Sequence, residues 1–176
     1  MIRRIVVNDV FAVNCYFYID DETQHGFLID PGAQASRILQ KIAENGWTIE
    51  RILLTHGHFD HTGAVSEIAQ TLGIPYCIHR AGEKYLTDTR WNLSAYCGRN
   101  VYLDGAEYFD DGDVIRLEPN PSFALKSSTL LDIPLTASSS IVSKIKLLLS
   151  VTPSFATVLA PRNISVETRC NFTIAS

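Results

Sequence analysis

The sequence predicts an α/β domain built from layers of helices and strands. Three observations favour this class. Apolar strand-like segments alternate with amphipathic helical segments, glycines follow the expected helix ends, and 176 residues can bury a core without disulfides. A single domain is the simplest organisation.

The N-terminal thirty residues are expected to form the opening strands of that sheet. Predicted strands, in chain order, are 3–11, 14–20 and 27–30. Asn8 and Asp9 interrupt the apolar stretch, and a strand-like alternation continues beyond them, so a secretory signal peptide is not expected. We therefore expect a cytoplasmic protein.

The alternation then continues to about residue 120. We expect a helix, a strand, a loop, a helix, a strand, a broken helical stretch and a turn that enters a strand, at 33–44, 51–55, 56–63, 64–72, 75–79, 81–100 and 109–117. Gly46 and Gly73 follow the two amphipathic helices as C-terminal stops.

Composition narrows the classes of partner. A formal net charge of −4 gives no electrostatic footprint for nucleic acid or an anionic membrane surface. No apolar run approaches the roughly 18 residues of a membrane span. The four cysteines form no CxxC pair and are expected to be reduced thiols. A small-molecule substrate is expected, with no nucleic-acid or membrane partner, and the oligomeric state stays open.

One short segment concentrates ligand-type side chains. Thr55 to Ala64 reads THGHFDHTGA and contains His56, His58, Asp60 and His61. In an extended segment, side chains two residues apart point the same way, so His56, His58 and Asp60 can face one point. His61 follows where the chain turns into a helix and can face a neighbouring point.

The setting of this segment favours a metal site over a solvated loop that happens to be rich in histidine. Gly57 lets the backbone run close to a metal, and Gly63 eases the start of the next helix. The segment follows the carboxyl end of a strand, where α/β sheets place their sites. Imidazole and carboxylate donors suit zinc, and iron and manganese are compatible with them.

The pattern HxHxDH after a short apolar strand resembles the metallo-β-lactamase superfamily. Together with FAVNCYFYID and FLIDPG, the segment THGHFDHTGA is most similar to its glyoxalase II (hydroxyacylglutathione hydrolase)-like branch. The resemblance covers about residues 1–120. It implies a metallo-β-lactamase-like αββα sandwich, of which only the N-terminal half, residues 1–125, is recognisable.

The resemblance also implies roles for individual residues. His56 and His58 would hold the first of two metal ions, and Asp60 and His61 the second. Asp60 would in addition be catalytic, orienting the nucleophile. Asp30 would lie behind these ligands, unless it is only a turn carboxylate before proline. The implied reaction is metal-assisted hydrolysis of a thioester, such as a glutathione thioester, with two zinc ions.

Three other side chains near these motifs are not expected to be ligands. We interpret His25 as an exposed turn residue, His79 as a strand-end residue and Phe59 as a packing residue.

The C-terminal part departs from this family. The family completes its site with two later histidines and a bridging aspartate, whereas here no histidine follows His79 and no glycine follows Gly112. The tail 126–176 is also basic and rich in serine and threonine. We therefore predict severely reduced activity and an exposed apolar sheet face where the second half is replaced.

A frameshift near Lys126 explains this departure. Codons for Ser127 to Leu135 can be chosen that read V-I-H-S-P-G-H-T-P when one G is restored. Codons for Val151 to Phe155 can likewise read G-D-T-L-F in the same restored frame, which supplies the first histidine motif and the bridging-aspartate motif in the family's order.

Two alternatives to an impaired thioester hydrolase remain open. One is another activity on the same fold: a persulfide dioxygenase, a lactonase or a nuclease. The other is a non-catalytic fragment of a disrupted gene.

Overall fold

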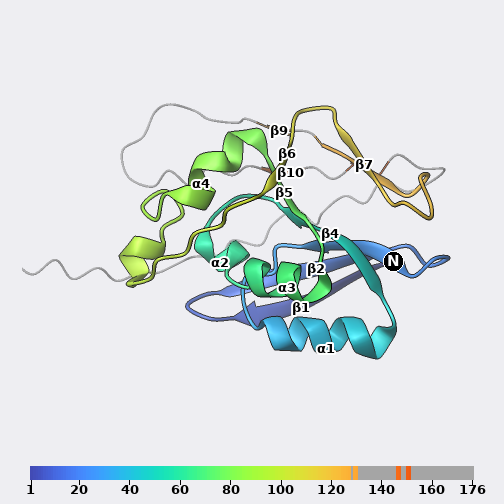
Figure 1. Cartoon of the computed structure of the whole chain (residues 1–176), viewed down its shortest axis with the longest axis horizontal. Coiled ribbons are helices and arrows are strands. Elements are labelled where there is room, and N and C mark those ends of the chain that lie inside the picture. The colour runs from blue at the N-terminus through green and yellow to red at the C-terminus, as the bar shows by residue number, and fades with distance from the viewer. Residues whose placement is uncertain (128, 131–145, 148–149, 152–176) are drawn as a thin grey trace, which may run out of the picture.

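The computed structural model describes residues 1–127, 129–130, 146–147 and 150–151. They form the mixed α/β arrangement that the sequence predicts (Figure 1). The predicted boundary between residues 125 and 126 stays a prediction, because most of the tail lies outside the described residues. Most of the residues to which the frameshift hypothesis applies lie outside them too.

A six-stranded sheet forms the centre of the described part, in the order β1-β2-β3-β4-β5-β6. Its strands are Ile2–Asn8, Ala12–Ile19, His25–Ile29, Thr48–Leu54, Tyr76–His79 and Glu107–Phe109. The first two pairings are antiparallel, whereas β3, β4, β5 and β6 run parallel. The carboxyl ends of these four strands therefore meet at one edge.

Two helices cover one face of this sheet, as Figure 1 shows for α1 and α3. They span Ala35–Asn45 and Val65–Leu72, and each is followed by a left-handed glycine, Gly46 or Gly73, as the sequence predicts. The buried side chains of Ile38 and Ile68 pack with apolar residues of the central strands. Burial of this face is the main contribution to the stability of the layer.

The opposite face is covered by a second, smaller sheet. Strands β7 (Val114–Arg116) and β8 (Ala124–Lys126) pair antiparallel, and β11 (Ser150–Val151) adds to β8. Leu117 and Leu125, each 1% exposed, form a buried cluster with apolar side chains of the central sheet. The prediction of a large exposed apolar face is therefore wrong for these residues, because the turn and strand expected at 109–117 continue into a covering hairpin. Strands β9 (Thr129–Leu130) and β10 (Lys146–Leu147) form a separate pair.

Short helices occupy the connections near the carboxyl edge of the sheet. They are α2 (Phe59–Thr62), η1 (Arg80–Gly82), α4 (Glu83–Thr87) and η2 (Ser94–Cys97). The last three confirm the broken helical stretch expected at 81–100. The expected loop at 56–63 is wrong in part, since one helical turn occupies its second half.

In the part of the chain that the structure describes, no helix combines the length and the apolar character that crossing a bilayer requires.

Candidate metal centre

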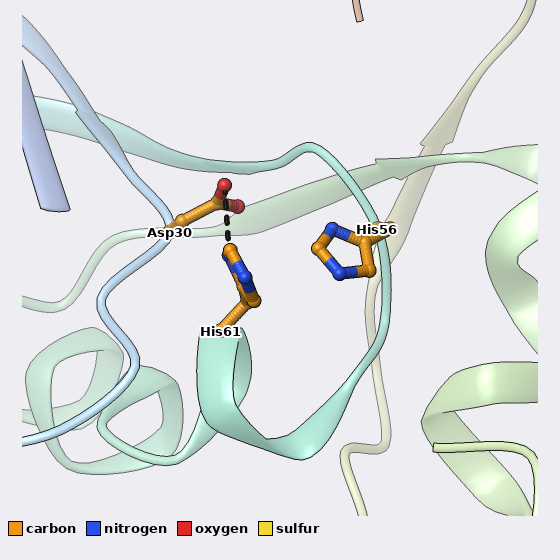
Figure 2. A group of neighbouring side chains, drawn as sticks. All are labelled: Asp30, His56 and His61. Atoms are coloured by element: carbon orange, nitrogen blue, oxygen red, sulfur yellow. Dashed lines mark ion pairs between the residues drawn. The ribbon is translucent and has the colours of Figure 1, made fainter. Parts of the chain in front are cut away.

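Three ligand-type side chains converge at the carboxyl edge of the sheet, as Figure 2 shows for Asp30, His56 and His61. Asp30 follows β3, His56 follows β4, and His61 belongs to α2. One ligand atom of each lies within 4.8 Å of those of the other two. This spacing is small enough for a single cation to contact all three.

Asp30 holds this group together from behind. Its side chain is buried, and its backbone adopts a left-handed φ of 51° that is uncommon for a residue other than glycine. The amide and hydroxyl of Thr55 donate to its two carboxylate oxygens at 2.8 and 2.6 Å. The structure therefore places Asp30 beside the predicted ligands, and it is more than a turn carboxylate.

The hydroxyl of Thr55 also determines which nitrogen of His56 is available. Thr55 Oγ1 lies 3.0 Å from His56 Nδ1. Because the single hydroxyl proton is donated to Asp30, Nδ1 of His56 must carry a proton and donate it to Thr55. Nε2 of His56 then has a free lone pair, which is what a metal ligand needs.

His58 and Asp60 lie next to the convergent group but outside it. The ring centroid of His56 is 4.6 Å from that of His58 and 4.2 Å from that of His61. Asp60 Oδ2 is 3.8 Å from His61 Nε2. The strand-like alternation expected to reach Asp60 is not found there, because α2 begins at Phe59 and places Asp60 in its first turn. That all four residues are ligands stays a prediction.

Burial and mutual repulsion keep two of the three imidazoles neutral. Burial, with the nearby His61 ring, lowers the pKa of His56 to about 3. Burial and His61 also lower the pKa of His58, although the charge of Asp60 acts in the opposite direction. Neutral imidazole is the form that binds a cation.

The contact between Asp30 and His61 lowers the pKa of Asp30 and raises that of His61, in both cases against the effect of burial. Although burial raises the pKa of the Asp30 carboxyl, the contacts with His61 and Thr55 lower it below its usual value. Although burial lowers the pKa of His61, the neighbouring Asp30 raises it. Asp30 is therefore an anion in the folded protein and a strong hydrogen-bond acceptor.

The donor set fits a divalent metal such as zinc. Nδ1 of His61 approaches Asp30 Oδ2 to 3.1 Å, but it is buried without a well-aligned hydrogen-bond partner among the described residues. The donor set at this edge of the sheet also includes three half-buried imidazoles and the half-buried carboxylate of Asp60. Imidazole nitrogen and carboxylate oxygen are the usual donors in catalytic zinc sites.

The two remaining histidines lie outside the group. His79 ends β5 as predicted, and its Nδ1 accepts a hydrogen bond from the amide of Ala81. The interpretation of His25 as an exposed turn residue is wrong: it is the first residue of β3, is partly buried, and places Nδ1 2.8 Å from Glu50 Oε1. Its partner lies on the neighbouring strand, which the local sequence could not show.

Sequence reasoning missed a residue that packs directly against the histidine segment. A Cβ on Gly57 would lie 2.5 Å from Cβ of Tyr85, so glycine is required here for close packing as well as for any approach to a metal. The Tyr85 ring lies 5.7 Å from that of His58. Only the position of an aromatic residue in the broken helical stretch could have hinted at this contact.

Phe59 is a packing residue, as predicted. It is 3% exposed, and the centroid of its ring lies 6.0 Å from that of the Phe11 ring.

Comparisons with known proteins agree with this geometry. The model of the metallo-beta-lactamase superfamily matches residues 8–147, so the chain belongs to that superfamily. Members of this superfamily are hydrolases, and the described residues contain a group able to bind a metal ion.

Individual relatives match over the same N-terminal part. A probable metallo-hydrolase of Bacillus subtilis, YqgX, is 38% identical over 112 residues, 63% of this chain and 52% of its own length. The hydroxyacylglutathione hydrolase GloC of Haemophilus influenzae is 29% identical over 118 residues, covering 65% of this chain and 55% of its own. The chain thus spans about half the length of the relatives it matches.

A solved structure supports the fold. The BLEG-1 B3 metallo-beta-lactamase superposes with a TM-score of 0.65 and 26% identity, over 73% of this chain and 61% of that protein. The α/β class and the metallo-β-lactamase-like architecture expected from the sequence are confirmed.

Proposed function

We propose that this chain is a metal-dependent hydrolase of thioesters or related esters, in the manner of glyoxalase II, whose activity is impaired by the altered tail. His56 and His58 would hold one divalent cation, and Asp60 with His61 a second. The observation that carries the proposal is the series of hydrogen bonds from Asp30 through Thr55 to His56. These bonds leave Nε2 of His56 with a free lone pair that can bind a metal ion. Similarity to the hydroxyacylglutathione hydrolase of Haemophilus influenzae supports the substrate class.

The chemistry follows from the donor set. Bound divalent cations of the zinc type lower the pKa of water to about 7 and polarise a carbonyl group. Asp30 fixes the orientation of Thr55 and lies against His61, so that these side chains need little rearrangement when a cation binds. Asp60 lies 3.8 Å from His61 and would accept a hydrogen bond from a nucleophilic water.

Impairment is part of the same proposal. Since no histidine follows His79, the tail offers no imidazole with which to complete two cation sites. The residual site would bind metal weakly and turn substrate over slowly. Zinc is the proposed ion, and a cytoplasmic location is supported by the thiols of Cys15 and Cys77, which form no disulfide among the described residues.

Metal analysis together with a thioester assay tests the proposal. The purified chain is loaded with zinc, dialysed, and measured by mass spectrometry for bound metal and by thiol release for hydrolysis. We expect weak metal retention and slow turnover, both abolished by the double substitution His56→Ala and His58→Ala. His25→Ala is the matched control, because it removes a histidine at the other end of β3.

Two results would contradict the proposal. Unchanged metal content in the double variant would show that these histidines are not ligands. Fast turnover with two tightly held ions would refute the impairment. Assays with a persulfide, a lactone and a nucleic acid would separate the other activities known on this fold, and aggregation without metal binding would favour a non-catalytic fragment.

A further inference from the structure

An aromatic and cationic group lies beside the histidine cluster. Its members are Lys84 and Tyr85 of α4 and Trp91 from the following connection. Tyr85 links it to the cluster, since its ring is 5.7 Å from that of His58 and 5.7 Å from that of Trp91, in edge-to-face geometry both times. A substrate bound at the histidines would therefore lie close to this group.

The backbone that carries Trp91 is fixed to the histidine segment. The amide of Phe59 donates to the carbonyl oxygen of Asn92 at 3.0 Å. The side chain of Asn92 is 1% exposed, donates to the carbonyl of Val101 at 2.8 Å and accepts from the amide of Ser94 at 3.0 Å. The backbone next to Trp91 is thus held in place against the histidine segment.

Trp91 is exposed in spite of this anchoring. Its side chain is 44% exposed, whereas Trp47, the other tryptophan, is 7% exposed in the core. A large aromatic surface left open beside a candidate metal centre offers contact area for the apolar part of a ligand.

Lys84 adds a positive charge at the same place. Its Nζ lies 3.7 Å from the centroid of the Trp91 ring and 5.4 Å from that of Tyr85. No carboxylate among the described residues forms an ion pair with it, in contrast to Lys41 on α1, which lies 3.7 Å from Glu44. Aromatic rings hold the ammonium group in place without neutralising its charge, so it can still pair with an anion.

We propose that Lys84 and Trp91 select the substrate of this site, favouring thioesters or esters that carry a carboxylate. Trp91 packs against the carbon chain of the substrate, and the ammonium group of Lys84 pairs with its carboxylate. This inference rests on the proposed function for the position of the reacting group. It concerns recognition alone, so it can be tested by binding without turnover.

A matched pair of unreactive ligands tests the selection. The first is a thioether analogue of an acyl thioester that ends in a carboxylate, and the second is its methyl ester, which differs only in charge. Binding of each to the zinc-supplemented full chain is measured by titration calorimetry and by quenching of tryptophan fluorescence. We expect tighter binding of the acid, with a quenching signal that Trp91→Phe removes.

Substitutions separate charge from packing. Lys84→Met should weaken binding of the acid about tenfold, roughly the effect of one partly exposed charge pair, and leave binding of the ester unchanged. Lys84→Arg should retain preference for the acid. Lys41→Met is the control for loss of a surface charge elsewhere. Trp91→Ala should weaken binding of both the acid and the ester.

Several outcomes would overturn the proposal. They are failure of the wild-type chain to bind either ligand, equal affinity for acid and ester, and a Lys84→Met variant that loses both equally or neither. Circular dichroism of each variant shows whether it is folded. Because neither ligand is hydrolysed, absence of hydrolase activity would count against the proposed function while leaving this measurement intact.

Discussion

Two histidine–carboxylate pairs lie at opposite ends of the same two parallel strands. At the amino end of β3 and β4, His25 Nδ1 is 2.8 Å from Glu50 Oε1. At the carboxyl end, His61 Nδ1 is 3.1 Å from Asp30 Oδ2. The side chains are 32% and 14% exposed in the first pair, and 22% and 5% in the second.

The surroundings make the two pairs different. Glu50 also accepts a hydrogen bond from the amide of Glu118, so the first pair connects backbone segments. Asp30 instead accepts from Thr55, which orients His56, and further imidazoles lie within ring contact. A histidine next to a carboxylate is therefore not a metal site by itself; the grouping of Asp30 with His56 and His61, beside a third imidazole, distinguishes the carboxyl end.

The largest expected effect is a gain in hydrolase activity when the missing ligands are supplied to the metal centre at the carboxyl end of β3 and β4. A chain whose tail is replaced by the restored-frame sequence, with V-I-H-S-P-G-H-T-P at 127–135, should hydrolyse thioesters at least about a hundredfold faster, because each missing ligand lowers metal affinity by a large factor. Kinetics with a thioester and metal analysis measure this. Sequencing the gene across the codons for Ala124 to Ser128 is the companion test. An unshifted reading of those codons, with no frame-shifted parent in close relatives, would end the frameshift hypothesis.

The next largest effect is expected on the free energy of unfolding, when a side-chain atom is added where the backbone segments at the carboxyl end of β3 and β4 pack closely. A Cβ on Gly32 would lie 1.7 Å from the backbone oxygen of Asp60, so Gly32→Ala should destabilise the fold by about 3 kcal/mol. Gly46→Ala, before β4, meets open space and only a strained φ of 66°, so it should lower stability by about 1 kcal/mol. Urea unfolding compares them, and equal losses would contradict the close approach of Gly32 and Asp60.

A moderate effect is expected from the hydroxyl that links Asp30 to His56. Thr55→Val keeps the shape of the side chain but removes the hydroxyl, so metal affinity should fall about tenfold. Thr55→Ser should retain the affinity of the wild-type chain. Zinc titration against a competing chelator measures the dissociation constants. If the valine variant bound zinc as tightly as the wild type, the orientation of His56 would not depend on this hydrogen bond.

The smallest effect is expected at the amino end. His25→Ala should lower the free energy of unfolding by less than about 1 kcal/mol, since the pair is partly exposed to solvent. Metal content should be unchanged. Thermal unfolding and metal analysis of this variant and of Glu50→Gln provide the comparison. Loss of metal in either variant would remove the distinction between the two ends.

Much of the fold and the identity of the histidine segment could be predicted from the sequence. The helix stops at Gly46 and Gly73 and the strand that ends at His79 depend on local patterns, which a single chain displays directly. The helical turn α2 was missed because four residues are too few for a periodic pattern. The cover over the second face was missed because hairpin pairing joins segments that share no local pattern.

Local sequence accounts for the α/β alternation and for the gathering of ligand-type side chains between His56 and His61, because neighbouring residues along a chain cannot move far apart. Folding in three dimensions was needed to bring Asp30 against His61 and Thr55, and to pack Tyr85 on Gly57. These contacts join segments about 25 residues or more apart, and their geometry depends on the order and direction of the strands.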